Sequence, residues 1–226
     1  MVSENIDPNS PYVISSGDGI SEAYPPGALE HLQQADPVLE RLIRHYGLIT
    51  RERNRPPLYA LVSAIVGQQI SVRAAAAIMT RLVALFPAGS SVGAAELAAV
   101  PFEQLRAVGL SSAKATYIHD LAEKVDRGVV NLTQLPNIDD ELVIQQLCAV
   151  KGIGRWTAEM FLIFSLGRLD VLAVEDMGLR AGIRRAYDLV ELPKAAAMRA
   201  LAEPWRPYRT IATFYFWHHL HATPLS

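Results

Sequence analysis

Residues 147–158 read LCAVKGIGRWTA, and this stretch decides which fold we expect. Two helical patterns meet in it through a tight turn that contains Gly152 and Gly154, and glycine permits positive φ and close approach by another backbone. Three aliphatic residues of the stretch, Leu147, Val150 and Ile153, are expected to pack into the core and hold the hairpin against it. The amides from Gly152 to Arg155 then lie exposed at the start of the following helix, where they and the helix dipole favour a phosphate oxygen. A glycine turn by itself, however, is just as typical of an ordinary helical hairpin.

Basic residues gather around this turn although the chain as a whole is slightly acidic. Lys plus Arg number 21 against 23 Asp plus Glu, which gives a formal net charge of -2 and no global attraction to a polyanion. Any nucleic-acid binding must therefore come from a local patch. Lys151 and Arg155 flank the turn, and four arginines follow it: Arg168, Arg180, Arg184 and Arg185.

The rest of the chain predicts helices. Apolar residues recur at helical spacing from Leu29 onward, and only residues 170–174 hint at a strand. We therefore expect an all-α protein of two helical lobes, with the hairpin at the cleft between them. Residues 1–56 should form an arm and helix that pack with the C-terminal lobe of residues 170–226, and residues 57–169 should form the central lobe.

Composition excludes several classes of protein. No apolar run approaches the roughly 18 residues that span a bilayer, and the polar N-terminus does not suit a signal peptide. We expect a soluble, monomeric protein of the cytoplasm, in a bacterial cytosol or nucleoid. The single cysteine, Cys148, excludes an intrachain disulfide and a metal centre held by four thiolates, and we expect it in the core. His218, His219 and His221 lack carboxylates at ligand spacing, which favours a surface or packing role over a metal site.

The residues after the turn carry a resemblance to a known family. The stretch GIGRWTA at 152–158 is followed by Phe161 and by DVLAVED at 170–176, and this combination strongly resembles the helix-hairpin-helix DNA glycosylase superfamily. Within it the chain looks most like the 3-methyladenine DNA glycosylase II branch; further markers are IVGQQIS at 65–71, VGL at 108–110 and the pair Lys114-Ala115. The resemblance implies an enzyme of base excision repair that flips an alkylated base out of duplex DNA, hydrolyses its N-glycosidic bond and leaves an abasic site.

The resemblance also implies that Asp176 is the catalytic carboxylate, with its neighbour Glu175 as the weaker candidate. Breaking an N-glycosidic bond develops positive charge on the deoxyribose, and a carboxylate near C1′ stabilises that charge. A purine alkylated at N3 or N7 already carries positive charge, so it leaves without a general acid. The alternative is that Asp176 merely caps the helix that begins near Met177, which is the usual role of an isolated aspartate at such a position.

Aromatic residues are the expected partners of a cationic base, because such a base stacks well on electron-rich rings. The resemblance implies that Trp217 on the final helix is a pocket aromatic, with Trp156 as a second candidate and Tyr215 behind them. Met160 stands where some relatives have a further aromatic. An aromatic stripe at helical spacing is usually core, and this alternative applies to Trp217 and above all to Tyr215.

A flipped nucleotide leaves a gap in the duplex that the protein must fill. Gln68 and the turn from Leu110 to Ser112 occupy positions that family members use for this. The residues implied to contact DNA are Gln68, Leu110, Ser111, Ser112, Lys151, Gly152, Gly154, Arg155 and Thr157. No cofactor is required, and the backbone carbonyls of Cys148, Val150 and Ile153 are implied to hold a monovalent cation that bridges to phosphate.

Departures from the family pattern restrict the reaction that we expect to hydrolysis of the glycosidic bond, without strand cleavage. Members that cleave the strand carry a lysine nucleophile where this chain has Trp156, which cannot form a Schiff base, so we expect a monofunctional enzyme. Members with an iron-sulfur cluster carry four cysteines, and the resembled bacterial branch often has a β-rich N-terminal domain for which 226 residues leave no room. Two alternatives stay open. One is a non-catalytic helix-hairpin-helix module that recognises DNA backbone or abasic sites, and the other is a glycosylase for oxidised or mismatched bases.

Overall fold

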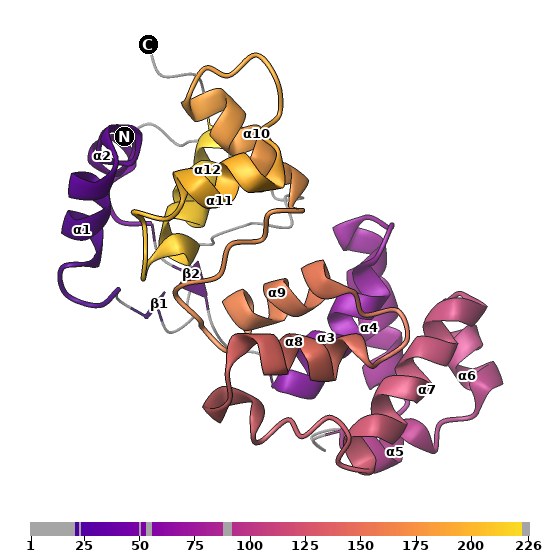
Figure 1. Cartoon of the computed structure of the whole chain (residues 1–226). Coiled ribbons are helices and arrows are strands. Elements are labelled where there is room, and N and C mark those ends of the chain that lie inside the picture. The colour runs from indigo at the N-terminus through magenta and orange to yellow at the C-terminus, as the bar shows by residue number, and fades with distance from the viewer. Residues whose placement is uncertain (1–20, 23, 50, 53–55, 88–91, 223–226) are drawn as a thin grey trace. The chain divides into compact units, whose positions relative to one another are not determined.

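The computed structural model describes residues 21–22, 24–49, 51–52, 56–87 and 92–222 (Figure 1). The expected all-α class is confirmed, because these residues form helices joined by short connections. The exception is a small antiparallel pairing between two-residue strands, β1 (Ser21–Glu22) and β2 (Arg51–Glu52). The strand suggested for residues 170–174 was wrong: that segment is irregular, and side chains rather than a neighbouring strand bond its backbone, since Val171 N donates to Thr210 Oγ1 at 2.9 Å.

The chain divides into two compact units. One comprises Met1–Asn54 with Gly167–Ser226, and the other comprises Arg55–Leu166. The N-terminal and C-terminal helices thus share one unit, while the hairpin stretch belongs to the other. The cleft expected between two lobes stays a prediction. Among the described residues, no helix combines the length and the apolar character needed to cross a bilayer.

In the first unit, Met1–Asn54 with Gly167–Ser226, other helices pack around the last helix of the chain. Its helices are α1 (Ala28–Ala35), α2 (Pro37–Tyr46), α10 (Met177–Ala186), α11 (Ala195–Leu201) and α12 (Arg209–His221). Nearly the whole of α12 is buried, and it packs against both α10 and α2 (Figure 1). Residues 210–217 are all buried, and such a run covers every side of the helix, so this part of α12 lies inside the core, where its aromatic residues pack.

A buried aspartate fixes the N-terminal helices to this core. Asp36 caps α2, because its Oδ1 accepts the Val38 amide at 2.8 Å. Its Oδ2 accepts the Trp205 indole N–H at 2.9 Å and the Tyr187 hydroxyl. Burial and the neighbouring carboxylate raise the pKa of Tyr187 well above its ordinary value. The hydroxyl therefore stays protonated and donates a hydrogen bond to Asp36.

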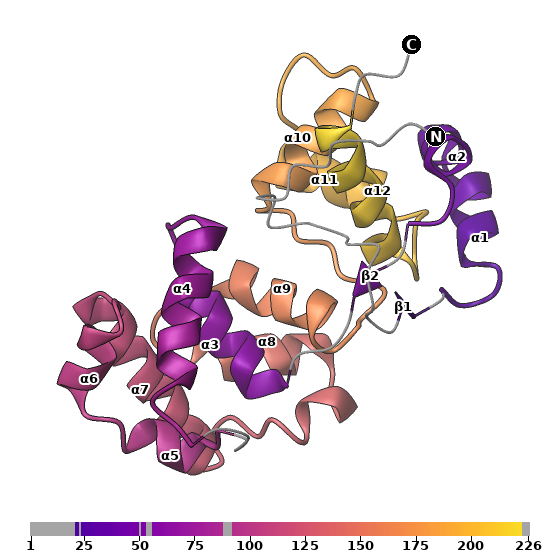
Figure 2. The same cartoon turned by 180° about the vertical axis from the view of Figure 1, so that it is seen from behind.

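The other unit surrounds an apolar helix, α3 (Pro57–Gly67), which contacts α4, α7 and α9 and lies beside α9 in Figure 2. Its other helices are α4 (Val72–Val83), α5 (Ala94–Ala98), α6 (Phe102–Ala107), α7 (Ser112–Asp126), the 3-10 turn η1 (Leu135–Asn137), α8 (Asp140–Cys148) and α9 (Arg155–Phe164). Serines begin two of them: Ser71 Oγ accepts the Ala74 amide at the start of α4, and Ser111 Oγ accepts the Lys114 amide at the start of α7.

Candidate functional site

The hairpin stretch forms the helix, turn and helix that its sequence predicts. Helix α8 ends at Cys148 and α9 begins at Arg155, and the three aliphatic residues expected to pin the turn, Leu147, Val150 and Ile153, are buried. Gly152 has a φ of 79°, and a Cβ placed there would lie 2.1 Å from Cδ2 of the Tyr117 ring. Only glycine therefore fits this turn without displacing Tyr117.

The start of α9 has a glycine as its N-cap. Gly154 is the N-cap and has no side chain that could accept hydrogen bonds from the first-turn amides. The first helical bond runs from the Ala158 amide to the Gly154 carbonyl at 3.0 Å, so the amides of residues 155–157 precede the regular bonding of the helix. Thr157 is buried, so its side chain belongs to the core and only its backbone suits the expected DNA contact.

The two cations that flank the turn both have carboxylate partners. Arg155 donates to Glu141 with Nη1 at 3.0 Å and with Nη2 at 2.5 Å, and its Nε donates to Glu159 at 3.0 Å. These partners, Glu141 first, raise the pKa of Arg155. Lys151 donates its amide to Asp120 Oδ2 at 2.8 Å, and its Nζ lies 3.8 Å from Asp120 Oδ1. The Arg155–Glu141 pair is solvent-exposed, where such pairs are weak and exchange readily.

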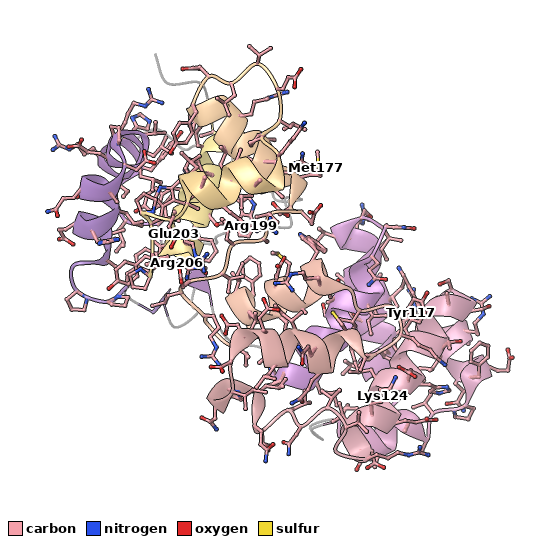
Figure 3. The ribbon with its side chains drawn as sticks, viewed as in Figure 1. Tyr117, Lys124, Met177, Arg199, Glu203 and Arg206 are labelled. Carbon is pink, nitrogen blue, oxygen red and sulfur yellow. The ribbon has the colours of Figure 1, made fainter. Side chains whose placement is uncertain are left out.

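Helix α7 contacts the hairpin with two side chains, Tyr117 and Lys124, which are labelled in Figure 3. The Lys124 ammonium donates to the Ala149 carbonyl at 2.7 Å and to Asp120 Oδ2 at 2.6 Å. A positive charge of the chain itself therefore lies against this turn. The Val150 carbonyl accepts the Ile153 amide at 3.1 Å. The monovalent cation expected at the carbonyls of Cys148, Val150 and Ile153 stays a prediction.

The loop between α3 and α4 is tied to the hairpin. The Gln68 side chain donates from Nε2 to the Gly152 carbonyl at 2.8 Å. The Lys114 ammonium donates to the Val66 carbonyl at 2.8 Å and to the Gln68 carbonyl at 2.6 Å, and burial lowers its pKa. Gln69 follows with a φ of 56°, in the left-handed region. Gln68, expected to fill a gap in DNA, thus bonds to the hairpin in this structure.

The turn after α6 differs from expectation at its first residue. Leu110 is 1% exposed, so its side chain packs in the core and cannot be the group that enters a duplex in this conformation. Ser111 and Ser112 are exposed, and Ser111 also caps α7. The backbone of the turn is braced by Arg81, whose Nε donates to the Val108 carbonyl at 2.7 Å, and by Arg106, which donates to the Leu110 carbonyl.

Asp176 is a buried carboxylate at the start of α10. It is 2% exposed, and its Oδ1 accepts the Leu179 amide at 2.6 Å as an N-cap. The same oxygen accepts the indole N–H of Trp217 at 2.8 Å. The capping interpretation is therefore confirmed, but Asp176 is also held by a second donor that capping does not require. Its neighbour Glu175 is exposed.

Two of the three expected aromatics are buried in α12, and the third is exposed on α9. Trp217 is 1% exposed in α12, and Tyr215 is fully buried there and donates its hydroxyl to the Gly47 carbonyl at 2.8 Å. Burial raises the pKa of Tyr215 to about 12, which fits the core interpretation of this residue. Trp156 belongs to the other unit, on the first turn of α9, and is 42% exposed. Met160, on the same helix, is half-buried.

Two further expectations concern metal-ligating residues. The expectation that Cys148 lies in the core was wrong, because the thiol is exposed at the end of α8. The packing role expected for the histidines is confirmed for His219, which is buried and hydrogen-bonded through Nδ1 to the Tyr46 hydroxyl at 2.9 Å. In the part of the chain that the structure describes, no three His, Cys, Asp or Glu residues are grouped as a metal site would need.

Comparison with known proteins gives a consistent result. The profile of the family described as HhH-GPD superfamily base excision DNA repair protein matches residues 62–207. The protein named DNA-3-methyladenine glycosylase 1 of Schizosaccharomyces pombe is 32% identical over 191 residues, which cover 83% of this chain and 84% of the relative. DNA-3-methyladenine glycosylase 2 of Escherichia coli is 30% identical over 70% of this chain and 55% of its own length.

Solved structures agree with these sequence matches. A DNA-3-methyladenine glycosidase from Bacillus halodurans has a TM-score of 0.78 at 37% identity and covers 88% of this chain and 90% of its own. The S. pombe 3-methyladenine DNA glycosylase Mag1, solved in complex with abasic DNA, has a TM-score of 0.75 at 32% identity and covers 84% of this chain and 94% of its own. The chain therefore belongs to the HhH-GPD superfamily of base excision DNA repair proteins.

Proposed function

We propose that this protein is a DNA glycosylase that removes alkylated bases of the 3-methyladenine type from duplex DNA and leaves an abasic site. The observation that carries the proposal is the carboxylate of Asp176, buried and bound by two N–H donors. The names of its relatives support the same substrate class, since both S. pombe Mag1 and the B. halodurans glycosidase act on 3-methyladenine by name. Such an enzyme works where the genome lies, which for a bacterial cell is the cytosol or nucleoid.

The chemistry that we propose for Asp176 is electrostatic. As the C1′–N bond breaks, its electron pair leaves with the base and neutralises the positive charge that alkylation gave it. Positive charge then develops on the deoxyribose, and the carboxylate stabilises it while water forms the new bond to C1′. The water proton passes to the carboxylate or to solvent. A carboxylate with little exposure acts more strongly on such a charge, because little water screens it.

Phosphate binding is assigned to the hairpin. The amides of the first turn of α9, together with the dipole of that helix, provide an anion site at which Lys151 and Arg155 can exchange a carboxylate for a phosphate. The carbonyls of Cys148, Val150 and Ile153 would supply oxygen ligands of the kind that suits a monovalent cation. Trp156, exposed beside these amides, carries no amine, so the proposed reaction ends at hydrolysis.

The experiment is base release from methylated duplex DNA by the wild type and by Asp176→Asn. Asparagine keeps an oxygen for the Leu179 and Trp217 donors but removes the charge, so we expect release to fall about 100-fold or more. Binding to a duplex with an abasic-site analogue should stay near the wild-type value, because the hairpin amides make the phosphate contacts.

The chain offers a matched control in Asp36→Asn. Asp36 is likewise a buried N-cap aspartate that accepts an indole N–H. Because both of its oxygens accept hydrogen bonds, this variant should lose at least as much stability, and it should keep wild-type release. Equal release by wild type and Asp176→Asn would overturn the assignment of the carboxylate. Binding without release from any modified duplex would instead support the non-catalytic module, and release of oxidised or mismatched bases alone would redefine the substrate.

A further inference from the structure

We propose that Trp217 is a positioning residue, which orients the Asp176 carboxylate through its indole N–H. This inference rests on the proposed role of Asp176. Trp217 Nε1 lies 2.8 Å from Asp176 Oδ1, which is the distance of a charge-assisted hydrogen bond. The indole is 1% exposed, so little water competes for this hydrogen bond.

The close approach of the two residues depends on glycines of α10. Gly178 and Gly182 lie four residues apart, on the same side of the helix. A Cβ at Gly182 would lie 2.4 Å from the Phe216 carbonyl oxygen, so only glycine lets the α12 backbone come this near. A Cβ at Gly178 would lie 3.3 Å from Cδ1 and Nε1 of Trp217 and 3.2 Å from Oδ1 of Asp176. The glycines thus make the room in which indole and carboxylate meet.

Two donors from different elements hold Asp176 better than the cap alone. The Leu179 amide comes from the first turn of α10, and the Trp217 indole comes from α12, which is 41 residues away in the sequence. A single hydrogen bond to Oδ1 leaves the carboxylate free to rotate about χ2, whereas a second donor from another direction fixes its plane. Preorganisation of this kind matters because a misplacement of about 1 Å can cost about 100-fold in rate.

A similar arrangement, in which a buried N-cap aspartate also accepts an indole N–H, occurs elsewhere in this unit without the proposed chemistry. Asp36 caps α2 with Oδ1, while its Oδ2 accepts the Trp205 indole at 2.9 Å and the Tyr187 hydroxyl. Trp205 is fully buried, as Trp217 is. A change at Trp205 therefore reproduces the loss of packing and of an indole hydrogen bond without touching Asp176.

The test compares Trp217→Phe with Trp205→Phe. We measure single-turnover release from methylated duplex DNA at saturating enzyme, affinity for an abasic-analogue duplex, and thermal stability. Trp217→Phe should lower the release rate about 10- to 100-fold with affinity unchanged, because an aromatic ring remains but the N–H is lost. Trp205→Phe should lose comparable stability and keep the wild-type rate.

A double variant tests whether Trp217 acts through the carboxylate. In an Asp176→Asn background, Trp217→Phe should cause no further loss of release. If Trp217→Phe folds poorly, β-(3-benzothienyl)alanine at position 217 replaces the N–H by sulfur at nearly constant shape, and the same loss of rate is expected.

The outcomes separate the two proposals. Wild-type release by Trp217→Phe alongside an inactive Asp176→Asn would overturn the positioning role and leave the proposed function intact. A full additional loss in the Asp176→Asn background, or an equal loss of rate in Trp205→Phe, would also overturn it. Wild-type release by Asp176→Asn would instead remove the proposed function itself.

Discussion

Replacing Gly152 by alanine should destabilise the hairpin through two separable effects. The first is the backbone: a φ of 79° lies in the left-handed region, which costs an L residue about 1–2 kcal/mol. The second is steric, because the new Cβ would lie 2.1 Å from Cδ2 and 2.5 Å from Cγ of Tyr117. These atoms belong to the body of the ring rather than to a flexible end, so overpacking should add about 1–3 kcal/mol. The free energy of unfolding should therefore fall by about 2–5 kcal/mol.

Denaturant unfolding measures this loss, and two further variants divide it. In a Tyr117→Ala background the steric part should disappear and the backbone part should remain, so Gly152→Ala should cost only about 1–2 kcal/mol there. Gly154→Ala is the matched control, since its Cβ would meet no atom within 4 Å, and its cost should stay below about 1 kcal/mol. Equal stability of Gly152→Ala and Gly154→Ala would refute the reasoning.

Three further predictions concern other parts of the molecule. Burial, and after it nearby arginines, lower the pKa of His219 to about 4, below the unfolded value of about 6.5. Its neutral form therefore stabilises the fold above about pH 6.5, and this stability is lost as the pH falls toward 4. Plotted against pH over this range, the Tm of His219→Gln should change less than that of the wild type. Gln68→Ala removes the bond to the Gly152 carbonyl, so affinity for an abasic-analogue duplex should fall several-fold at unchanged Tm, and wild-type affinity in anisotropy titrations would contradict this. Because Trp156 replaces the lysine nucleophile, borohydride should trap no covalent enzyme–DNA adduct, and an adduct on a denaturing gel would disprove the hydrolytic reaction.

The hairpin could be predicted from the sequence because its determinants are local. Buried aliphatic residues at 147, 150 and 153 and a glycine with positive φ are all contained in one short stretch. The helices followed from apolar spacing for the same reason. The signal for Asp176 was also local, since an aspartate before a helix predicts a cap, and the cap is present.

The surroundings of the site could not be predicted because they depend on distant residues. Nothing near Leu110 in sequence indicates that it is buried, and nothing near Cys148 indicates that it is exposed. The Trp217 bond to Asp176 spans 41 residues. One signal was available, since the spacing of Gly178 and Gly182 on one helix face is typical of close helix packing.

From the sequence, Lys114 is recognisable only as a family marker. Its ammonium bonds to the Val66 and Gln68 carbonyls, about 46 to 48 residues away, and spacing alone does not indicate this link. Tyr117, one turn further along α7, carries no local signal of its role, although Gly152 leaves room for its ring. Both residues support the turns expected to contact DNA without being part of them.

The proposed function has two parts, phosphate binding at α9 and a fixed negative charge at α10, and the N-cap residue of each helix accounts for its part. Both α9 and α10 begin with amides and a positive dipole end that attract negative charge. Gly154 has no side chain that could cap α9, and the acceptor that we propose there is an external phosphate. Asp176 satisfies an amide at α10 with a carboxylate of the chain itself, so the same physical preference fixes an internal negative charge. A second donor, the Trp217 indole of α12, then also restricts the orientation of this carboxylate, which an ordinary cap does not do.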